Sequence, residues 1–101
     1  MKLWYQSLVH KAETQPYAKL LHKTFAQCTD PGTEVVLHGI HNSLGLGVHY
    51  RFLEYQDMKD VIYNAIRAEK EGYDAFLIAN SSDAGLREAR EMVNKIGRAH
   101  V

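Results

Sequence analysis

The stretch EGYDAFLIANSSD, residues 71–83, runs from a glycine through five consecutive apolar residues into a cluster of small polar side chains. A glycine directly after a helix accepts the left-handed backbone of a helix cap, so we expect Gly72 to end the preceding helix. The apolar run 75–79 is typical of a strand covered on both faces in a parallel sheet. Residues 80–83 offer the side chains that cap a helix start. This stretch therefore predicts a helix, a buried strand and a second helix in succession.

The segment before this stretch, residues 54–71, has the periodicity of an amphipathic helix. Its apolar residues recur on one stripe: Met58, Val61, Ile62, Ala65 and Ile66. Its polar residues fall outside that stripe, where we expect them to face solvent: Asp57, Lys59, Asp60, Asn64 and Arg67.

The same alternation extends over the rest of the chain. Residues 2–9 and 34–39 are apolar and short enough for strands. Pro16 opens a helical pattern that reaches Cys28, and we expect Cys28 to be buried in the apolar stripe of that helix. A last helix begins near Leu86. Three strand and helix units in alternation predict the α/β class: a three-layer, Rossmann- or flavodoxin-like parallel sheet of three strands in the order 2-1-3, with helices on both faces.

Composition restricts the partners and the compartment. The chain has 101 residues, of which 46% are hydrophobic and 24% charged, and its 12 basic and 12 acidic side chains give a net charge of zero. A balanced chain without a basic cluster offers little to nucleic acid or to an anionic membrane. No apolar run is long enough for a membrane span, and the single cysteine cannot form an internal disulfide. We therefore expect a cytoplasmic protein that binds neither nucleic acid nor membranes.

The last residues depart from the helical pattern. Residues 96–101, with the sequence IGRAHV, look like the in-frame translation of a sequencing-adapter oligonucleotide, so we expect them to contribute few contacts. On this interpretation residues 1–95 form an N-terminal α/β half that originally continued into a second half.

Polar residues follow the first and third predicted strands: Tyr5, Gln6 and Ser7 after the first, and Asn80, Ser81, Ser82 and Asp83 after the third. Parallel sheets place ligands at the carboxyl ends of their strands, and the backbone N–H groups of a helix start attract anions. The pattern is compatible with a small carboxylate or imide ligand. It is equally compatible with a helix cap and a strand end that have no ligand.

The histidines do not form a recognisable metal site. His38, His41 and His49 are the closest group, but their spacing matches neither a helix face nor one side of a strand, and no nearby carboxylate completes a ligand set. We therefore expect no metal.

Three stretches together resemble the hydantoin racemase branch of the aspartate/glutamate racemase superfamily, over about residues 2–94. They are LWYQS at 3–7, DPGTEV at 30–35 with His38 and Gly39, and GYDAF at 72–76 continuing through DAGL at 83–86 to ARE at 89–91. The resemblance implies a fold of two similar α/β halves with the substrate between them, of which this chain is the first. It also implies catalysis without a cofactor.

In that family two opposed cysteines, one from each half, remove and deliver a proton at the carbon next to a carbonyl. The first cysteine corresponds to Asn80, which cannot exchange a proton, and Ala84 stands where the family usually has proline. The resemblance leaves Asp83 and Ser81 as candidate catalytic residues. The expected substrate-binding residues are Tyr5, Gln6, Ser7, Asn80, Ser82 and Gly85.

The resulting hypothesis is a fragment of an amino-acid or hydantoin racemase-like isomerase, which we expect to be inactive by itself. With Asn80 in the cysteine position, the chain could also belong to a branch that catalyses another reaction on a similar substrate. The alternative from a different class is a non-catalytic module that binds a small carboxylate. In each case the expected partner is a small molecule. We also expect the chain to associate into a homo-oligomer, because a half of this kind leaves a sheet edge and an apolar helix surface uncovered.

Overall fold

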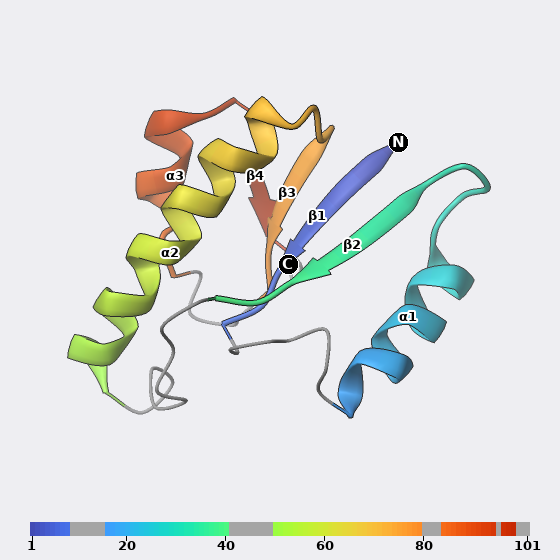
Figure 1. The fold of residues 1–101 in the computed structure, drawn as a ribbon, viewed down its shortest axis with the longest axis horizontal. Coiled ribbons are helices and arrows are strands. Elements are labelled where there is room, and N and C mark those ends of the chain that lie inside the picture. The colour runs from blue at the N-terminus through green and yellow to red at the C-terminus, as the bar shows by residue number, and fades with distance from the viewer. Residues whose placement is uncertain (9–15, 41–49, 80–83, 95, 99–101) are drawn as a thin grey trace.

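The computed structural model describes residues 1–8, 16–40, 50–79, 84–94 and 96–98. Its strands are β1 (Lys2–Gln6), β2 (Glu34–His38), β3 (Ala75–Ile78) and β4 (Ile96–Arg98), which form one parallel sheet in the order β2-β1-β3-β4 (Figure 1). The expected parallel order 2-1-3 of the first three strands is confirmed.

β4 is an addition to the expected sheet. Its backbone pairs with β3, with Phe76 opposite Ile96 and Ile78 opposite Arg98. Our expectation that the tail makes few contacts is therefore wrong for Ile96–Arg98. The physical reason is that the hydrogen bonds between strands use backbone groups, which every non-proline residue carries. The side-chain pattern is therefore a weak guide to which segment pairs with the open edge of a strand such as β3. The origin of the tail stays a prediction.

Helices cover both faces of the sheet, as expected (Figure 1). α1 (Tyr17–Cys28) lies on one face beside β2, whereas α2 (Arg51–Lys70) and α3 (Leu86–Met92) lie together on the other. Right-handed connections produce this arrangement because the chain moves one way from β1 to β2 and then reverses towards β3. Gly72 has a φ of 84° and follows α2 closely, which confirms the expected left-handed cap.

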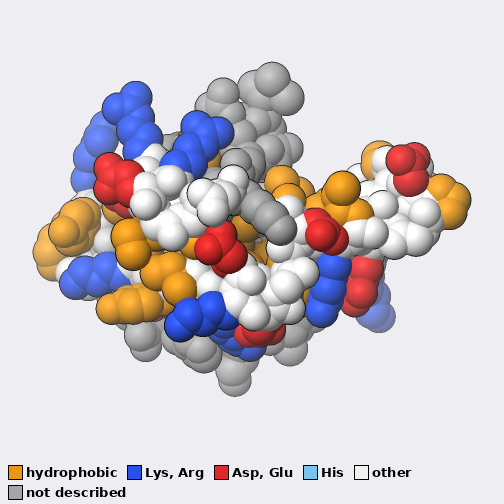
Figure 2. Space-filling model, turned by 90° about the horizontal axis from the view of Figure 1, so that it is seen from above, with side chains coloured by type: hydrophobic (Ala, Val, Ile, Leu, Met, Phe, Trp, Pro, Cys, Tyr) orange, Lys and Arg blue, Asp and Glu red, His pale blue; other side chains and the backbone are white. Residues whose placement is uncertain are grey.

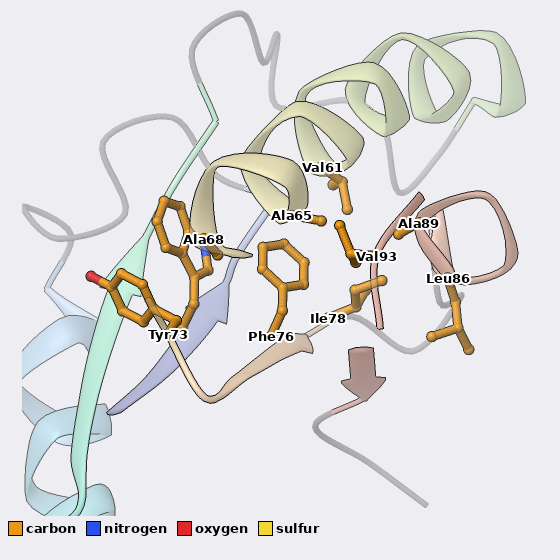
Figure 3. Close-up of a cluster of buried hydrophobic side chains, with 10 residues drawn as sticks. Val61, Ala65, Ala68, Tyr73, Phe76, Ile78, Leu86, Ala89 and Val93 are labelled. Carbon is orange, nitrogen blue, oxygen red and sulfur yellow. The ribbon is translucent and has the colours of Figure 1, made fainter. Parts of the chain in front are cut away.

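The larger core lies between the sheet and α2 with α3 (Figure 3). Val61 and Ala65 of α2 pack towards Phe76 and Ile78 of β3. Trp4 of β1 is completely buried in the same cluster. This core fixes the position of α2 relative to the ends of β1 and β3, and those ends are where the candidate site lies.

The core on the α1 face is smaller. Ala18 and Leu37 are its buried residues, and Tyr5 and Leu21 pack against them. Our expectation that Cys28 is buried is wrong, because this cysteine is exposed, and Leu20 is 66% exposed. Ala18 and Leu21 of α1 pack on the sheet, whereas Leu20 and Cys28 remain in contact with solvent.

The described surface carries charges of both signs. Figure 2 shows Lys and Arg side chains interspersed with Asp and Glu side chains over one face of the molecule. Within the described residues, no helix is both long enough and apolar enough to cross a bilayer.

Candidate functional site at the carboxyl edge of the sheet

The carboxyl ends of the first three strands finish side by side. Ser7 N donates a hydrogen bond of 2.9 Å to the carbonyl oxygen of His38, and Ala79 N donates one of 3.0 Å to the carbonyl oxygen of Gln6. These bonds continue both ladders of β1 one step past its end. The residue after Ala79 is Asn80, which lies outside the described residues, as do Ser81, Ser82 and Asp83. Their expected roles stay predictions, and the described edge consists of residues around Gln6 and Ser7.

Gln6 joins β1 to β2 and α2 through a completely buried side chain. Its Nε2 donates to the carbonyl oxygens of Ser7 at 2.8 Å and Gly39 at 3.1 Å. Its Oε1 accepts hydrogen bonds from Trp4 Nε1 at 2.8 Å and from Asn64 Nδ2 at 2.9 Å. Both ends of the amide are thus occupied by protein groups. In this structure Gln6 shapes the edge, and a ligand would have to displace one of these bonds to reach its amide.

Asn64 differs from our sequence expectation of a solvent-facing residue. It is half-buried, and besides Gln6 it reaches the carbonyl oxygen of Gly39 at 3.3 Å. Helical periodicity assigns residues by polarity, so a polar residue on the sheet-facing side of a helix is misassigned. A glutamine at the end of a buried strand could have signalled the need for such a partner, because buried amides are normally hydrogen-bonded.

A group of hydroxyls lies on the opposite, α1 side of the same edge. Ser7 Oγ lies 3.0 Å from the hydroxyl oxygen of Tyr17, at the start of α1, and either atom can donate. The helical pattern that opens at Pro16 counts Tyr17 as an apolar residue, so its hydroxyl was not among the polar groups expected at this edge. The position of Tyr17 near a helix start could have indicated this role. A tyrosine there can bury its apolar ring while its hydroxyl reaches back to a strand end.

Tyr5 lies two residues before Ser7 and contributes a phenol on the same side. Its ring is 5.0 Å from that of Phe25, between ring centroids. Burial raises the pKa of the Tyr5 phenol above its usual 10.0, and the proximity of Tyr17 adds to the rise. Tyr5 therefore remains a neutral phenol at physiological pH, suited to hydrogen bonding and unsuited to acting as a base.

Gly85 has a structural requirement of its own. It precedes α3 with a φ of 79°, and an added Cβ would lie 3.1 Å from Met58 Cγ and 3.4 Å from Val61 Cγ1. The position thus needs glycine both for its backbone conformation and for the close approach of α3 to α2. This packing accounts for Gly85 without a ligand, and its expected substrate contact stays a prediction.

Asp57 of α2 is buried, although we expected it to face solvent. Its side chain is 5% exposed, one turn before the core residue Val61. Burial raises the pKa of its carboxyl above the usual 3.8, and the negative charges of Asp60 and Glu54 add to the rise. Nothing in the sequence pattern indicated this burial, because an aspartate outside the apolar stripe of a helix is ordinarily exposed.

No family model and no curated protein matches this chain. The candidate site therefore rests on the described residues. Within them, no three His, Cys, Asp or Glu side chains gather closely enough to hold a metal ion.

The described edge can bind a small polar molecule through hydrogen bonds. Ser7 and Tyr17 supply two hydroxyls, which can both donate and accept. Tyr5 adds a phenol that stays protonated at neutral pH. Such groups can hold carbonyl or carboxylate oxygens, and a neutral hydroxyl is a poor acceptor for a proton taken from carbon.

Proposed function

We propose that this chain is the N-terminal half of a cofactor-independent, racemase-like isomerase that moves a proton at a carbon next to a carbonyl. The substrate class is an amino acid, a hydantoin or a related small carboxylic compound. The observation that carries the proposal is the pairing of β1 with β3. Because Ala79 N is bonded to the carbonyl of Gln6, Ala79, the last described residue before Asn80, lies at the carboxyl end of β1 next to the Gln6–Ser7 segment.

The described residues would bind the substrate. Removal of an α-proton leaves negative charge on the adjacent carbonyl oxygen, and hydrogen-bond donors aimed at that oxygen stabilise it. Ser7 and Tyr17 form one hydrogen bond with each other, and when Ser7 is the donor in it, the Tyr17 O–H is a donor of this kind. Our resemblance-based candidates for proton transfer are Asp83 and Ser81, and Asp83 is the better base because a carboxylate is ionised at neutral pH. The second acid or base would come from an opposing half.

A non-catalytic module that binds a small carboxylate is the alternative. One observation favours it: the hydroxyls of Ser7 and Tyr17 at the described edge are neutral hydrogen-bonding groups. Asn80 in the position of the family's cysteine points the same way, since an amide binds oxygens but does not exchange protons at neutral pH.

The deciding experiment measures exchange of the substrate α-proton in deuterated water by proton NMR, with a hydantoin and the corresponding amino acid as substrates. We expect exchange above the buffer rate with the uninterrupted gene product and none with residues 1–101 alone, because proton transfer needs both walls within hydrogen-bond reach. Binding without exchange by the full-length protein would establish the alternative. If the full-length protein shows no binding and no exchange, both proposals are overturned.

A cytoplasmic location belongs to the same proposal, since a single cysteine suits a reducing compartment. The proposed partner is the small-molecule substrate, without a cofactor, and a second copy of the protein in a homo-oligomer.

A further inference from the structure

The first turns of α2 carry a hollow of about 450 Å³. Its lining includes Asp57 and Asp60, the aromatic residues Phe52 and Tyr63, and Lys59. These turns extend past the ends of β1 and β3 (Figure 1). Sites for small molecules have volumes of about 300–1,000 Å³, so the hollow is large enough for one.

Asp57 is the unusual member of this lining. Asp57 is 5% exposed, and among the described residues no ion pair involves it. Its carboxylate oxygens are not among the fully enclosed polar atoms of the described residues, so they keep a small contact with the hollow. A carboxylate largely removed from water and without a protein donor costs folding free energy. Its neighbours Glu54 and Asp60 increase that cost by repulsion. A buried polar group left without a protein partner calls for an explanation, and a ligand that supplies the missing charge is a direct one.

The walls of the hollow indicate what kind of ligand this is. Phe52 is 69% exposed and Tyr63 is 70% exposed, so both rings are open to a ligand. Aromatic faces attract cations, and a nearby carboxylate attracts them further. Lys59 lines the hollow, but no described ion pair joins it to Asp57. A divalent metal fits less well, because the described residues hold no group of three side chains able to share one.

We propose that this hollow binds a small organic ammonium ion, with the charged nitrogen against Asp57 and the apolar body on Phe52 and Tyr63. The described lining of the hollow comes from α2 and includes neither Ser7 nor Tyr17, and the proposal does not depend on the proposed isomerase activity. Its test is a binding measurement, so its outcome is separate from that of the exchange assay.

The probe is benzylammonium, and benzyl alcohol is the matched neutral compound with the same ring. Both are titrated into the ¹⁵N-labelled 101-residue chain, and amide shifts are followed by NMR. We expect benzylammonium to give saturable shifts in the first turns of α2 with a dissociation constant in the millimolar range or below, and benzyl alcohol to bind at least about tenfold more weakly.

Three variants complete the test. Asp57→Asn should weaken benzylammonium binding at least about tenfold. Asp30→Asn, which removes the same charge from an exposed turn, should leave it unchanged. Phe52→Ala changes an exposed side chain and should weaken binding several-fold without disturbing the core. Equal binding by the wild type and Asp57→Asn, equal binding of the alcohol, or no saturable shift would each overturn the proposal.

Discussion

Asn64 of α2 and Trp4 of β1 donate hydrogen bonds to the same atom, Oε1 of Gln6, at 2.9 and 2.8 Å. The oxygen uses both of its lone pairs, and the amide nitrogen of Gln6 is bonded to backbone carbonyls at the ends of β1 and β2. One buried side chain thus ties two strands and a helix together at the edge where we place the candidate site. A network of this kind fixes a unique arrangement only when all its members are satisfied.

Replacing Gln6 with leucine should destabilise the fold. Leucine has a similar size but leaves the Trp4 indole N–H and the Asn64 amide without their acceptor in a buried place. Each such group costs about 1–3 kcal/mol. Urea denaturation should therefore show a lower free energy of unfolding for Gln6→Leu. Gln27→Leu, on the exposed surface of α1, is the matched control and should change little. Equal effects of the two substitutions would contradict the network.

Gly85→Ala should cost more stability than Gly32→Ala. Both glycines have left-handed backbone, with φ of 79° and 90°, so alanine pays about 1–2 kcal/mol at either position. At Gly85 the new Cβ also meets Met58 at 3.1 Å, whereas nothing lies within 4 Å at Gly32. The difference between the two unfolding free energies measures the crowding between α2 and α3. If Gly85→Ala is no worse than Gly32→Ala, the close approach is not a constraint.

The strand order was predictable because it depends on features that repeat along the chain. The alternation of apolar runs with helical stripes predicts parallel strands, and the handedness rule then leaves few arrangements. The run Ala75–Ile78 is apolar on both sides, and the structure places helices on both faces of the sheet. The position of the edge residue Ser7 beside His38 and Ala79 follows from the same rule.

The side chains that define the site were less predictable, because periodicity assigns a residue to one environment. Asn64 and Asp57 are polar, so the pattern assigned them to solvent, although one completes a buried network and the other lines a hollow. Tyr17 has both an apolar ring and a hydroxyl, and the pattern registered only the ring. Whether such a side chain is buried or exposed depends on its contacts with other helices and strands. The hydrophobic periodicity of one segment does not contain those contacts.

Asp57→Asn should stabilise the protein at neutral pH. The pKa of the Asp57 carboxyl is raised in the folded state by burial, so the folded protein holds its proton more tightly than the unfolded chain does. Between the ordinary value of 3.8 and the raised folded value, stability falls as pH rises, because the folded state must then carry a buried charge. Asparagine is neutral and avoids that loss.

Thermal unfolding across pH 4 to 8 checks this expectation. The melting temperature of Asp57→Asn should exceed that of the wild type near pH 7, and the gap should shrink as pH falls towards 4. The exposed Asp30→Asn variant controls for the change in net charge. A wild type that is more stable than Asp57→Asn at neutral pH would mean that the carboxylate is well stabilised as an anion.

Removing residues 96–101 should lower stability, although the sequence pattern led us to expect few contacts from them. The deletion uncovers the backbone edge of β3 at Phe76–Ile78, where β4 pairs. Each lost backbone hydrogen bond contributes about 0.5–1.5 kcal/mol. A chain ending at residue 98 keeps β4 and serves as the control. Equal melting temperatures for the two shortened chains would show that the pairing adds nothing and would favour the original interpretation of the tail.

The position of Asn80 connects the proposed reaction to a single substitution. If the full-length protein keeps the family's pocket but lacks its first cysteine, Asn80→Cys should create or raise exchange of the substrate α-proton, because a thiolate can remove a proton that an amide cannot. Asp83→Asn in the same protein removes the carboxylate that we propose as the alternative base. Proton NMR in deuterated water gives the exchange rates of the parent and of both variants.

The two substitutions separate the possible bases. Exchange that rises with Asn80→Cys and persists in Asp83→Asn places the proton transfer at position 80. Exchange that is unchanged by Asn80→Cys and lost in Asp83→Asn assigns it to the carboxylate. Ser7→Ala is the control for binding: because Ser7 Oγ pairs with Tyr17 at the edge, its loss should weaken substrate binding and leave the identity of the base unchanged. Rates unaffected by all three substitutions would place the site away from the carboxyl edge of β1 and β3.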